Sequence, residues 1–319
     1  MFEKIIEKIE KYDVITIHGH IFPDGDCYGS QIAMREIIKL NYPNKEVYAI
    51  GSGYRRFHEF IGEMDDVSLE VIEKSLAIIV DVNDLYRCED NRIFKAKDWA
   101  KVDHHIDTFR YKEGPQVIRT SANSCCEIIC DLVNENHFKI NATIANALYL
   151  GIMTDSGRFQ YITDFVKAFS DLEWLCQNGA DPKTLNRLLN ITYEPILEFK
   201  GFVYTHYVTT KDGVIYLILN KEQLKRFNLT ADKAGSLVNL ISNVHGYPIW
   251  VFFCETEDGK DHLEIRSNGP VIQQVAFHFG GGGHLLASGA TLDRFDEESI
   301  QEVVDMLNVT AKEYLKKEK

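Results

Sequence analysis

The stretch Leu76-Ala-Ile-Ile-Val-Asp-Val82 (LAIIVDV) decides the fold class of this 319-residue chain. Its apolar residues run without the polar alternation of a half-exposed strand, and so predict a strand buried on both faces of a parallel sheet. Asp81 stands near the end of this run. Because open α/β sheets bind ligands at the carboxyl ends of their strands, Asp81 is a candidate functional residue. One acid in such a position is common, so its meaning depends on the rest of the chain.

Segments with strand and helix periodicity alternate through the first 150 residues. The pattern predicts further strands and several helices, at 14–18, 46–51 and 99–104 for the strands and at 2–9, 31–40, 121–135, 141–153 and 163–179 for the helices. This alternation indicates an α/β fold with a parallel sheet and helices on both of its faces.

The pattern changes after about residue 183. Helical stretches at 183–190 and 194–205 lead into two hairpin signals, around Lys211-Asp212-Gly213 and around Asp258-Gly259. Helices are predicted at 231–242 and 296–317, which makes this part α+β. We therefore expect three parts, namely an N-terminal domain over 1–185, a helical connector over 186–205 and a smaller C-terminal domain over 206–319.

Composition excludes several classes of function. Asp and Glu number 48 against 35 Lys and Arg, and the net charge of -13 argues against adhesion to long nucleic acid or to an anionic membrane. No apolar run approaches the ~20 residues of a membrane span, and the N-terminus lacks the apolar core of a signal peptide. The seven cysteines are odd in number and form no CxxC pair, which indicates reduced thiols. We expect a cytoplasmic protein.

Four separate segments place Asp or His directly after an apolar element. These candidate residues are His20, Asp24, Asp26, Asp81, Asp103, His104, His105 and Asp155. Each segment alone has an ordinary explanation as a turn, a strand end or a helix cap. Together they indicate a cation, because clustered carboxylates repel one another and Asp/His ligation without thiolate favours Mn²⁺-like or Zn²⁺-like ions. Two such ions suit an in-line phosphoryl displacement.

The two adjacent histidines are expected to have different roles. Neighbouring residues in a strand project to opposite faces, so His104 and His105 would not both bind one ion unless the chain turned between them.

A glycine run near the C-terminus is a candidate phosphate site. Gly280–Gly283 can bring backbone N–H groups close to a phosphate, and a helix expected to begin after the run would add its dipole. Arg266 could make a bidentate contact with a phosphate. A flexible loop is the alternative explanation of the glycines.

These motifs together resemble those of a known superfamily. HxxxDGD (His20 to Asp26), Asp81, Asp103-His104-His105 and TDSGRF (Thr154 to Phe159) look like the four motifs of the DHH phosphoesterases. GGGGH with Arg266 resembles the DHHA1 substrate domain of that superfamily. The likeness covers nearly the whole chain in the right order, and its form is similar to the NrnA-type nanoRNase/pAp phosphatase group. It implies a DHH metal-binding domain over 1–185 and a DHHA1 domain over 206–319.

The resemblance implies two bound Mn²⁺ ions, with Co²⁺ or Mg²⁺ as substitutes. One ion would be held by His20, Asp24 and Asp81, and the other by Asp26, Asp81, His104 and Asp155, with Asp81 bridging. Cys27 follows the DGD motif, where a small apolar residue is frequent in the superfamily, and is interpreted as a buried thiol rather than a ligand.

The resemblance also implies roles outside the ligand set. Asp103 would orient His104, and His105 would contact the scissile phosphate or protonate the leaving oxygen. Asp81, Asp103 and His105 are therefore the candidate catalytic residues. The residues expected to bind the substrate are Arg158, Arg266, Gly281, Gly282, Gly283 and His284.

The implied activity is hydrolysis of small phosphate esters. Substrates would be very short 5'-phosphorylated oligoribonucleotides, including pApA, together with 3'-phosphoadenosine 5'-phosphate (pAp), which links the chain to RNA degradation and to cyclic-di-AMP turnover. A phosphoanhydride hydrolase of the pyrophosphatase or exopolyphosphatase type is one alternative, and the glycine run with Arg266 argues against it. A non-catalytic nucleotide- or RNA-binding module is another, which a missing metal ligand would favour. A homodimer remains open.

Overall fold

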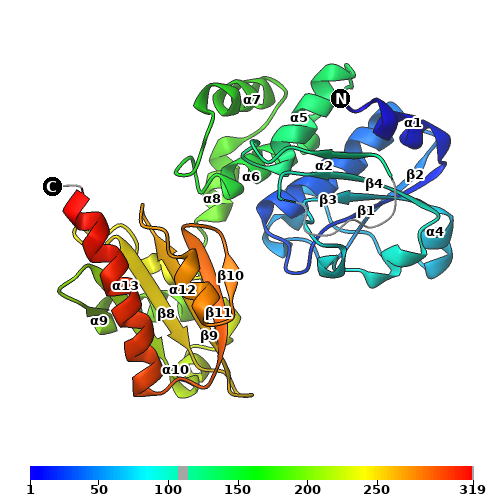
Figure 1. The fold of residues 1–319 in the computed structure, drawn as a ribbon. Coiled ribbons are helices and arrows are strands. Elements are labelled where there is room, and N and C mark those ends of the chain that lie inside the picture. The colour runs from blue at the N-terminus through cyan, green and yellow to red at the C-terminus, as the bar shows by residue number, and fades with distance from the viewer. Residues whose placement is uncertain (107–113, 318–319) are drawn as a thin grey trace. The chain divides into compact units, whose positions relative to one another are not determined.

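The computed structural model describes residues 1–106 and 114–317 and shows two compact units, Met1–Ile191 and Thr192–Lys319 (Figure 1). Each unit has its own sheet and its own hydrophobic core. The division between them falls inside the 186–205 stretch that the sequence pattern assigns to a connector.

The first unit contains a five-stranded sheet in which every pair is parallel, in the order β2-β1-β3-β4-β5. Its strands are β1 (Val14–His18), β2 (Glu46–Ile50), β3 (Leu76–Val80), β4 (Asp98–Asp103) and β5 (Gln116–Ile118). The predicted parallel α/β fold is confirmed. The short strand β5 was outside the prediction because three residues show no recognisable period.

Helices and short 3₁₀ turns cover the two faces of this sheet. The helices are α1 (Glu3–Lys11), α2 (Gly25–Asn41), α3 (His58–Ile61), α4 (Leu69–Lys74), α5 (Cys125–Glu135), α6 (Ala142–Asp155), α7 (Phe165–Gln177) and α8 (Pro182–Leu189). Helices α2, α5 and α6 pack together on one face, where Ile78 of β3 points. Ile79 points to the other face, which the 3₁₀ turns Leu85–Arg87 and Asn91–Lys95 cover. Strand β3 is therefore buried on both faces, as predicted.

Helix α2 begins at Gly25, six residues before the predicted start. Asp24 caps it, with Oδ1 accepting from the backbone N–H groups of Asp26 and Cys27. Small residues let α2 lie close to α6, since a Cβ on Gly29 would come within 2.4 Å of the Ala147 carbonyl oxygen. The DGD motif thus occupies the first turn of a helix that packs tightly against α6.

The second unit contains a six-stranded mixed sheet in the order β10-β11-β9-β8-β7-β6. Its strands are β6 (Val208–Thr209), β7 (Val214–Leu219), β8 (Ile249–Cys254), β9 (Lys260–Ser267), β10 (Gly282–Gly283) and β11 (Ala287–Asp293). Strands β7 and β8 are parallel and the other pairs are antiparallel. Both predicted hairpins are present, as β6–β7 and β8–β9.

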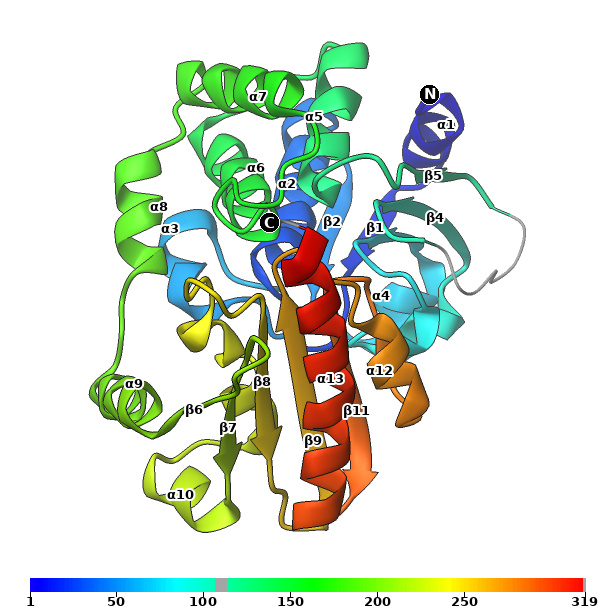
Figure 2. The ribbon, with the colours of Figure 1, turned by 60° about the vertical axis from the view of Figure 1, so that its left-hand side comes forward.

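Two helical layers enclose this second sheet. The helices are α9 (Glu194–His206), α10 (Lys221–Arg226), α11 (Ala231–Gly235), α12 (Gln273–His278) and α13 (Glu297–Lys317). Figure 2 shows α13 lying along β8 and β9, where Val251 and its neighbours pack against α12 and α13. Phe252 points to the opposite layer, formed by α9, α10 and α11. The helix predicted over 231–242 is α11 followed by a 3₁₀ turn at Val238–Ile241.

Two further features concern the helices and the cysteines. Among residues 1–106 and 114–317, no helix combines the length and the apolar character needed to cross a membrane. All seven cysteines lie in this part of the chain, and all seven are free thiols.

Candidate metal centre

The four segments that the sequence singles out meet at the carboxyl edge of the parallel sheet. The residues brought together are His20 after β1, Asp24 and Asp26 at the start of α2, Asp81 after β3, Asp103, His104 and His105 at the end of β4, and Asp155 at the end of α6. Elements far apart in sequence thus deliver acids and imidazoles to one place, as the sheet-edge argument requires.

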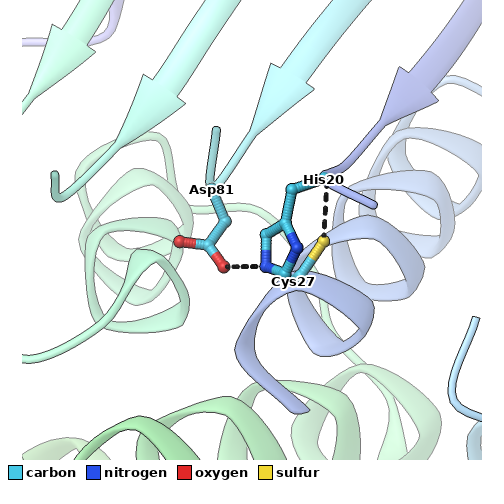
Figure 3. Close-up of side chains that lie close together, drawn as sticks. All are labelled: His20, Cys27 and Asp81. Atoms are coloured by element: carbon cyan, nitrogen blue, oxygen red, sulfur yellow. Dashed lines mark hydrogen bonds and ion pairs between the residues drawn. The ribbon is translucent and has the colours of Figure 1, made fainter. Parts of the chain in front are cut away.

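Asp81 lies at the centre of this group. It is 2% exposed. Its φ of +58° is a left-handed backbone conformation that residues other than glycine seldom adopt. Its Oδ2 lies 3.6 Å from His20 Nε2, a contact that Figure 3 draws, and its Oδ1 lies 3.3 Å from His104 Nε2. The two carboxylate oxygens therefore face two different imidazoles.

The His20 ring is oriented by its own backbone. His20 Nδ1 lies 2.8 Å from the Ile21 carbonyl oxygen, so in the neutral ring the proton is assigned to Nδ1. That leaves the lone pair on Nε2, which faces Asp81 and lies 3.9 Å from Asp24 Oδ2. A histidine that binds metal commonly has this arrangement, in which the far nitrogen donates to a carbonyl.

Asp26 is fixed by the start of helix α5. Its Oδ2 accepts from the N–H of Cys125 at 2.7 Å and its Oδ1 from the N–H of Cys126 at 3.0 Å, where the helix dipole also favours a negative charge. Gly151 of α6 makes room, since a Cβ there would lie 2.5 Å from Asp26 Oδ1. These contacts are not among those predicted from the sequence, although Ser124 is a recognisable N-cap that locates the start of α5.

A second group of contacts surrounds His104. Its Nε2 lies 3.4 Å from Asp155 Oδ2 and 3.9 Å from Asp26 Oδ2, in addition to its approach to Asp81. His104 therefore faces three carboxylates, from α2, β3 and α6.

The donor set fits divalent cations. In the described part of the chain, Asp81 Oδ1 and His104 Nε2 are buried side-chain atoms without a hydrogen-bond partner. Such atoms are costly unless something satisfies them, and carboxylate oxygens with imidazole nitrogens are ligands that divalent transition metals accept. A cation among these atoms would satisfy both.

The electrostatics of the group also favour a positive charge. Burial, followed by the negative charge of Asp81, raises the pKa of Asp155 to about 7, and burial with neighbouring carboxylates raises the pKa values of Asp24 and Asp26. Burial alone would lower the pKa of His104, but the surrounding carboxylates raise that pKa to about 10. Without a metal ion, Asp155 and His104 therefore retain protons that compensate the negative charge, and a bound cation could take over that role.

The Asp103-His104-His105 motif does not follow strand alternation, while different roles for His104 and His105 stay a prediction. Strand β4 ends at Asp103, so alternation no longer governs the histidines, and His105 Nδ1 also approaches Asp81 Oδ1, at 3.4 Å. Asp103 does not orient His104. Its Oδ1 accepts from the backbone N–H of His105 at 3.1 Å and lies 2.9 Å from His105 Nδ1.

Cys27 is a buried thiol, as interpreted from the sequence. Its Sγ accepts the backbone N–H of His20 at 3.2 Å, which Figure 3 shows together with Asp81. Burial raises the pKa of the Cys27 thiol well above its ordinary value, and this disfavours the thiolate form that binds metal. Cys27 therefore supports the backbone of His20.

Arg158 contacts helix α8 rather than the acidic group. Its φ is +57°, and its Nη1 donates to Asn190 Oδ1 at 2.9 Å, directly after the last residue of α8. The structure thus places the predicted phosphate-binding guanidinium against Asn190.

The glycine run forms a hairpin, and the helix expected after it is absent. Gly282 and Gly283 form β10, which pairs with β11, and helix α12 precedes the run instead of following it. The difference lies in β11, which pairs with β10 and β9 and so continues the chain as a strand. No helix dipole therefore follows Gly283, whose φ of +127° suits glycine.

Arg266 lies beside this glycine hairpin. It is paired with Ala287 across β9 and β11, and its Nη1 donates to the Ser288 carbonyl oxygen at 3.3 Å and lies 3.0 Å from Glu264 Oε2. His284 is exposed at the tip of the hairpin. The second unit thus brings the predicted substrate residues to the end of its sheet formed by β10, β11 and β9; these residues are Arg266, Gly281, Gly282, Gly283 and His284.

Family models match both units. The model described as "DHH family, N-terminal domain" matches residues 14–152, and the model of the DHHA1 domain matches residues 211–313. The resemblance inferred from the motifs is confirmed.

Curated relatives match nearly the whole chain. The chain is 35% identical to the bifunctional oligoribonuclease and PAP phosphatase NrnA of Mycoplasma genitalium, over 94% of each chain. It is 34% identical to the protein of the same name from Bacillus subtilis, over 93% of this chain and 95% of the relative.

A solved structure shares the fold. An exopolyphosphatase-related protein from Bacteroides fragilis aligns with a TM-score of 0.86 and 23% identity, over 99% of this chain and 97% of that one. The family models and the curated relatives place the chain: it belongs to the DHH family, carries both a DHH and a DHHA1 domain, and has NrnA proteins among its relatives.

Proposed function

We propose that the chain is a Mn²⁺-dependent phosphohydrolase that degrades very short 5'-phosphorylated oligoribonucleotides, including pApA, and dephosphorylates pAp to AMP. The observation that carries this proposal is Asp81, whose two oxygens face imidazoles from two different ligand groups. The names of the relatives, which are oligoribonucleases and PAP phosphatases, supply the substrate class.

Asp81 is proposed to bridge two ions. His20, Asp24 and Asp81 would hold one, and Asp26, Asp81, His104 and Asp155 the other. When bound, a pair of divalent ions supplies a water of lowered pKa and compensates negative charge on phosphoryl oxygens. Mn²⁺ suits mixed oxygen and nitrogen ligation, and Co²⁺ or Mg²⁺ are proposed substitutes.

The chain itself is proposed to supply a proton. His105 Nδ1 is engaged by Asp103, which leaves Nε2 as the ring nitrogen able to meet the leaving ribose oxygen. As water oxygen forms a new bond to phosphorus, the bond to the leaving oxygen breaks and that oxygen takes the Nε2 proton of a doubly protonated His105 ring. The proton released by the water restores the ring to that state, so that protons balance over one turnover.

Substrate binding is proposed for the second unit. Arg266 and the N–H groups of Gly281, Gly282 and Gly283, with His284, would hold a phosphate that is not cleaved, and Arg158 would contribute from the first unit. Arg266 would exchange its contact with Glu264 for the substrate. The net charge of -13 fits a small ligand better than long RNA, a homodimer is compatible with the proposal, and the cytoplasm is the expected location.

The proposal is tested with four substrates and purified protein. With Mn²⁺ we expect AMP from both pApA and pAp, no turnover of a long single-stranded RNA, and no activity after chelation. Phosphate released from pyrophosphate, with pApA and pAp left intact, would instead establish a phosphoanhydride hydrolase. Binding of pApA without any turnover would establish a binding module.

A further inference from the structure

A buried lysine lies next to the candidate metal centre in the middle of strand β4. Lys101 is 4% exposed, and in the sheet it lies opposite Ile79 of β3. That position belongs to the face on which Ile79 and Trp99 pack against the 3₁₀ turns. Because burying an unpaired ammonium costs free energy, a lysine in such surroundings is expected to have a negatively charged partner.

One partner of Lys101 is Asp103, two residues along the same face of β4. Lys101 Nζ lies 3.2 Å from Asp103 Oδ2, and the two form an ion pair. Asp103 is fully buried, so this ammonium is its nearest compensating charge on that oxygen.

The other oxygen of Asp103 is committed to His105. Oδ1 accepts from both the backbone N–H and Nδ1 of His105, and two contacts from one residue define the orientation of the ring. The His105 side chain is 31% exposed, so the ring extends from a buried anchor toward solvent. Lys101, Asp103 and His105, here called the β4 triad, thus form one continuous set of contacts from the interior of the sheet to the site.

We infer that Lys101 is a positioning residue for the phosphohydrolase reaction: it fixes the Asp103 carboxylate, which in turn holds the Nδ1–H of His105 and turns the other ring nitrogen, Nε2, toward the leaving group. The proton given to the leaving oxygen is a second one, carried by Nε2, while the Nδ1 proton stays with Asp103. The inference rests on the proposed function for its chemistry. Lys101 is not one of the proposed metal ligands, and its proposed effect on the reaction passes through Asp103.

A comparison of leaving groups separates this role from a merely structural one. In Lys101→Met we expect kcat on pApA to fall about tenfold to a hundredfold, a part of what a general acid contributes. On the p-nitrophenyl ester of AMP, whose leaving group needs no proton, kcat should change by less than about threefold. Bound Mn²⁺, measured by elemental analysis, should be unchanged.

Two further variants serve as controls, and two outcomes would overturn the inference. Lys74→Met, on the exposed end of α4, should match the wild type on both substrates. Lys101→Arg should recover much of the loss, because it restores the charge. If Lys101→Met loses equal activity on both substrates, or loses metal in step with activity, the inference is overturned.

A second measurement needs no turnover. Nitrogen NMR of the histidine rings, with the His105 signals assigned from His105→Gln, should show a proton on Nδ1 in the wild type and a mixture of tautomers in Lys101→Met. An unchanged Nδ1 proton in Lys101→Met overturns the inference, even if the wild type hydrolyses pApA. A wild type that cleaves neither pApA nor pAp instead overturns the proposed function and leaves the NMR outcome to decide this one.

Removing one charge of a buried pair can prevent folding. Lys101→Met/Asp103→Asn removes both charges while keeping similar volumes. If the single variant does not fold, this double variant should fold, show the same mixed tautomers and have the same selective loss on pApA. A normal His105 signal in the double variant would overturn the inference.

Discussion

The candidate metal centre and the glycine hairpin are built in opposite ways. At the metal centre, Asp26 and Asp81 are buried and fixed by backbone groups of neighbouring elements, and their charges lie within a few ångströms of one another. At the hairpin, His284 is exposed, and Arg266 is engaged by Glu264 on its own strand.

This difference indicates that the two regions contribute to ligand binding in different ways. The metal centre concentrates like charges before any ligand arrives, so its residues are prearranged for cations and change little on binding. At the hairpin, Arg266 would exchange its contact with Glu264 for the substrate, so on the proposed function this region would contribute affinity that depends on the substrate. Variants of the two regions should therefore fail in different kinetic parameters.

The largest expected effect is at Asp81. Asp81→Ala removes the residue proposed to contact both ions and should lower kcat on pApA by about a thousandfold or more, since metal stabilisation of transition-state charge is worth several kcal/mol. Metal content should fall as well. Asp84→Ala, in the turn that follows β3, serves as the control. Near-normal activity of Asp81→Ala would contradict the bridging assignment.

A smaller effect, confined to substrate affinity, is expected at Arg266. Arg266→Ala should raise KM for pApA about tenfold to a hundredfold, because a charge-assisted hydrogen bond is worth ~1.5–3 kcal/mol. Bound metal should stay the same. Arg226→Ala, on exposed α10, should leave KM unchanged. If metal content in Arg266→Ala fell together with activity, the contrast between the two regions would be lost.

Metal removal should make stability depend on pH. Contacts with Asp81, Ile21 and Asp24 outweigh burial and raise the pKa of His20 from 6.5 to about 9 in the folded chain, so its stabilising contribution is complete below pH 6.5 and is lost as the pH rises through about 9. The raised pKa of Asp155, about 7, acts in the same direction, because the folded state retains a proton there.

The melting temperature of metal-free protein should therefore fall between pH 6.5 and 9. Saturating Mn²⁺ should remove this fall and stabilise by ~2.7 kcal/mol at a hundred times Kd. Calorimetry at a series of pH values measures both. Parallel pH profiles with and without Mn²⁺ would show that the ions do not replace these protons.

The smallest effect should distinguish two glycines of the hairpin. A Cβ on Gly282 meets only Phe277, at 3.5 Å, whereas a Cβ on Gly281 would lie 2.1 Å from the Gly289 carbonyl oxygen. Gly282→Ala should fold normally and raise KM for pAp by about threefold if the backbone approaches a phosphate there. Gly281→Ala should instead lower the melting temperature. Unchanged KM in Gly282→Ala would favour a purely structural turn.

Much of the fold was predictable because apolar residues recur with regular strand or helix periodicity through the first unit. The run from Leu76 to Val80 required a buried parallel strand, and the acids after apolar segments required a common sheet edge. The early start of α2 was not predictable from period, because Gly25 and its neighbours are small and polar and α6 packs against them.

The sequence predicted which residues form the site, but it did not predict which of them contact one another. Strand alternation cannot say where a strand ends, and a difference of one residue at Asp103 decides which imidazole that carboxylate holds. Lys101 gave no signal, since a single lysine in a strand looks like a solvent-facing residue. The strand β11 after the glycines was missed because Gly289 and Ala290 have weak strand propensity.

The left-handed backbone at Asp81 has an evolutionary consequence. Glycine and asparagine adopt a φ near +58° at lower cost than aspartate, and neither adds a negative charge to an acidic interior. A descendant of this chain that no longer needed its ions would gain stability by losing the carboxylate at this position. Glycine or asparagine there, in a chain that keeps the rest of the fold, would mark a lineage released from selection for hydrolysis.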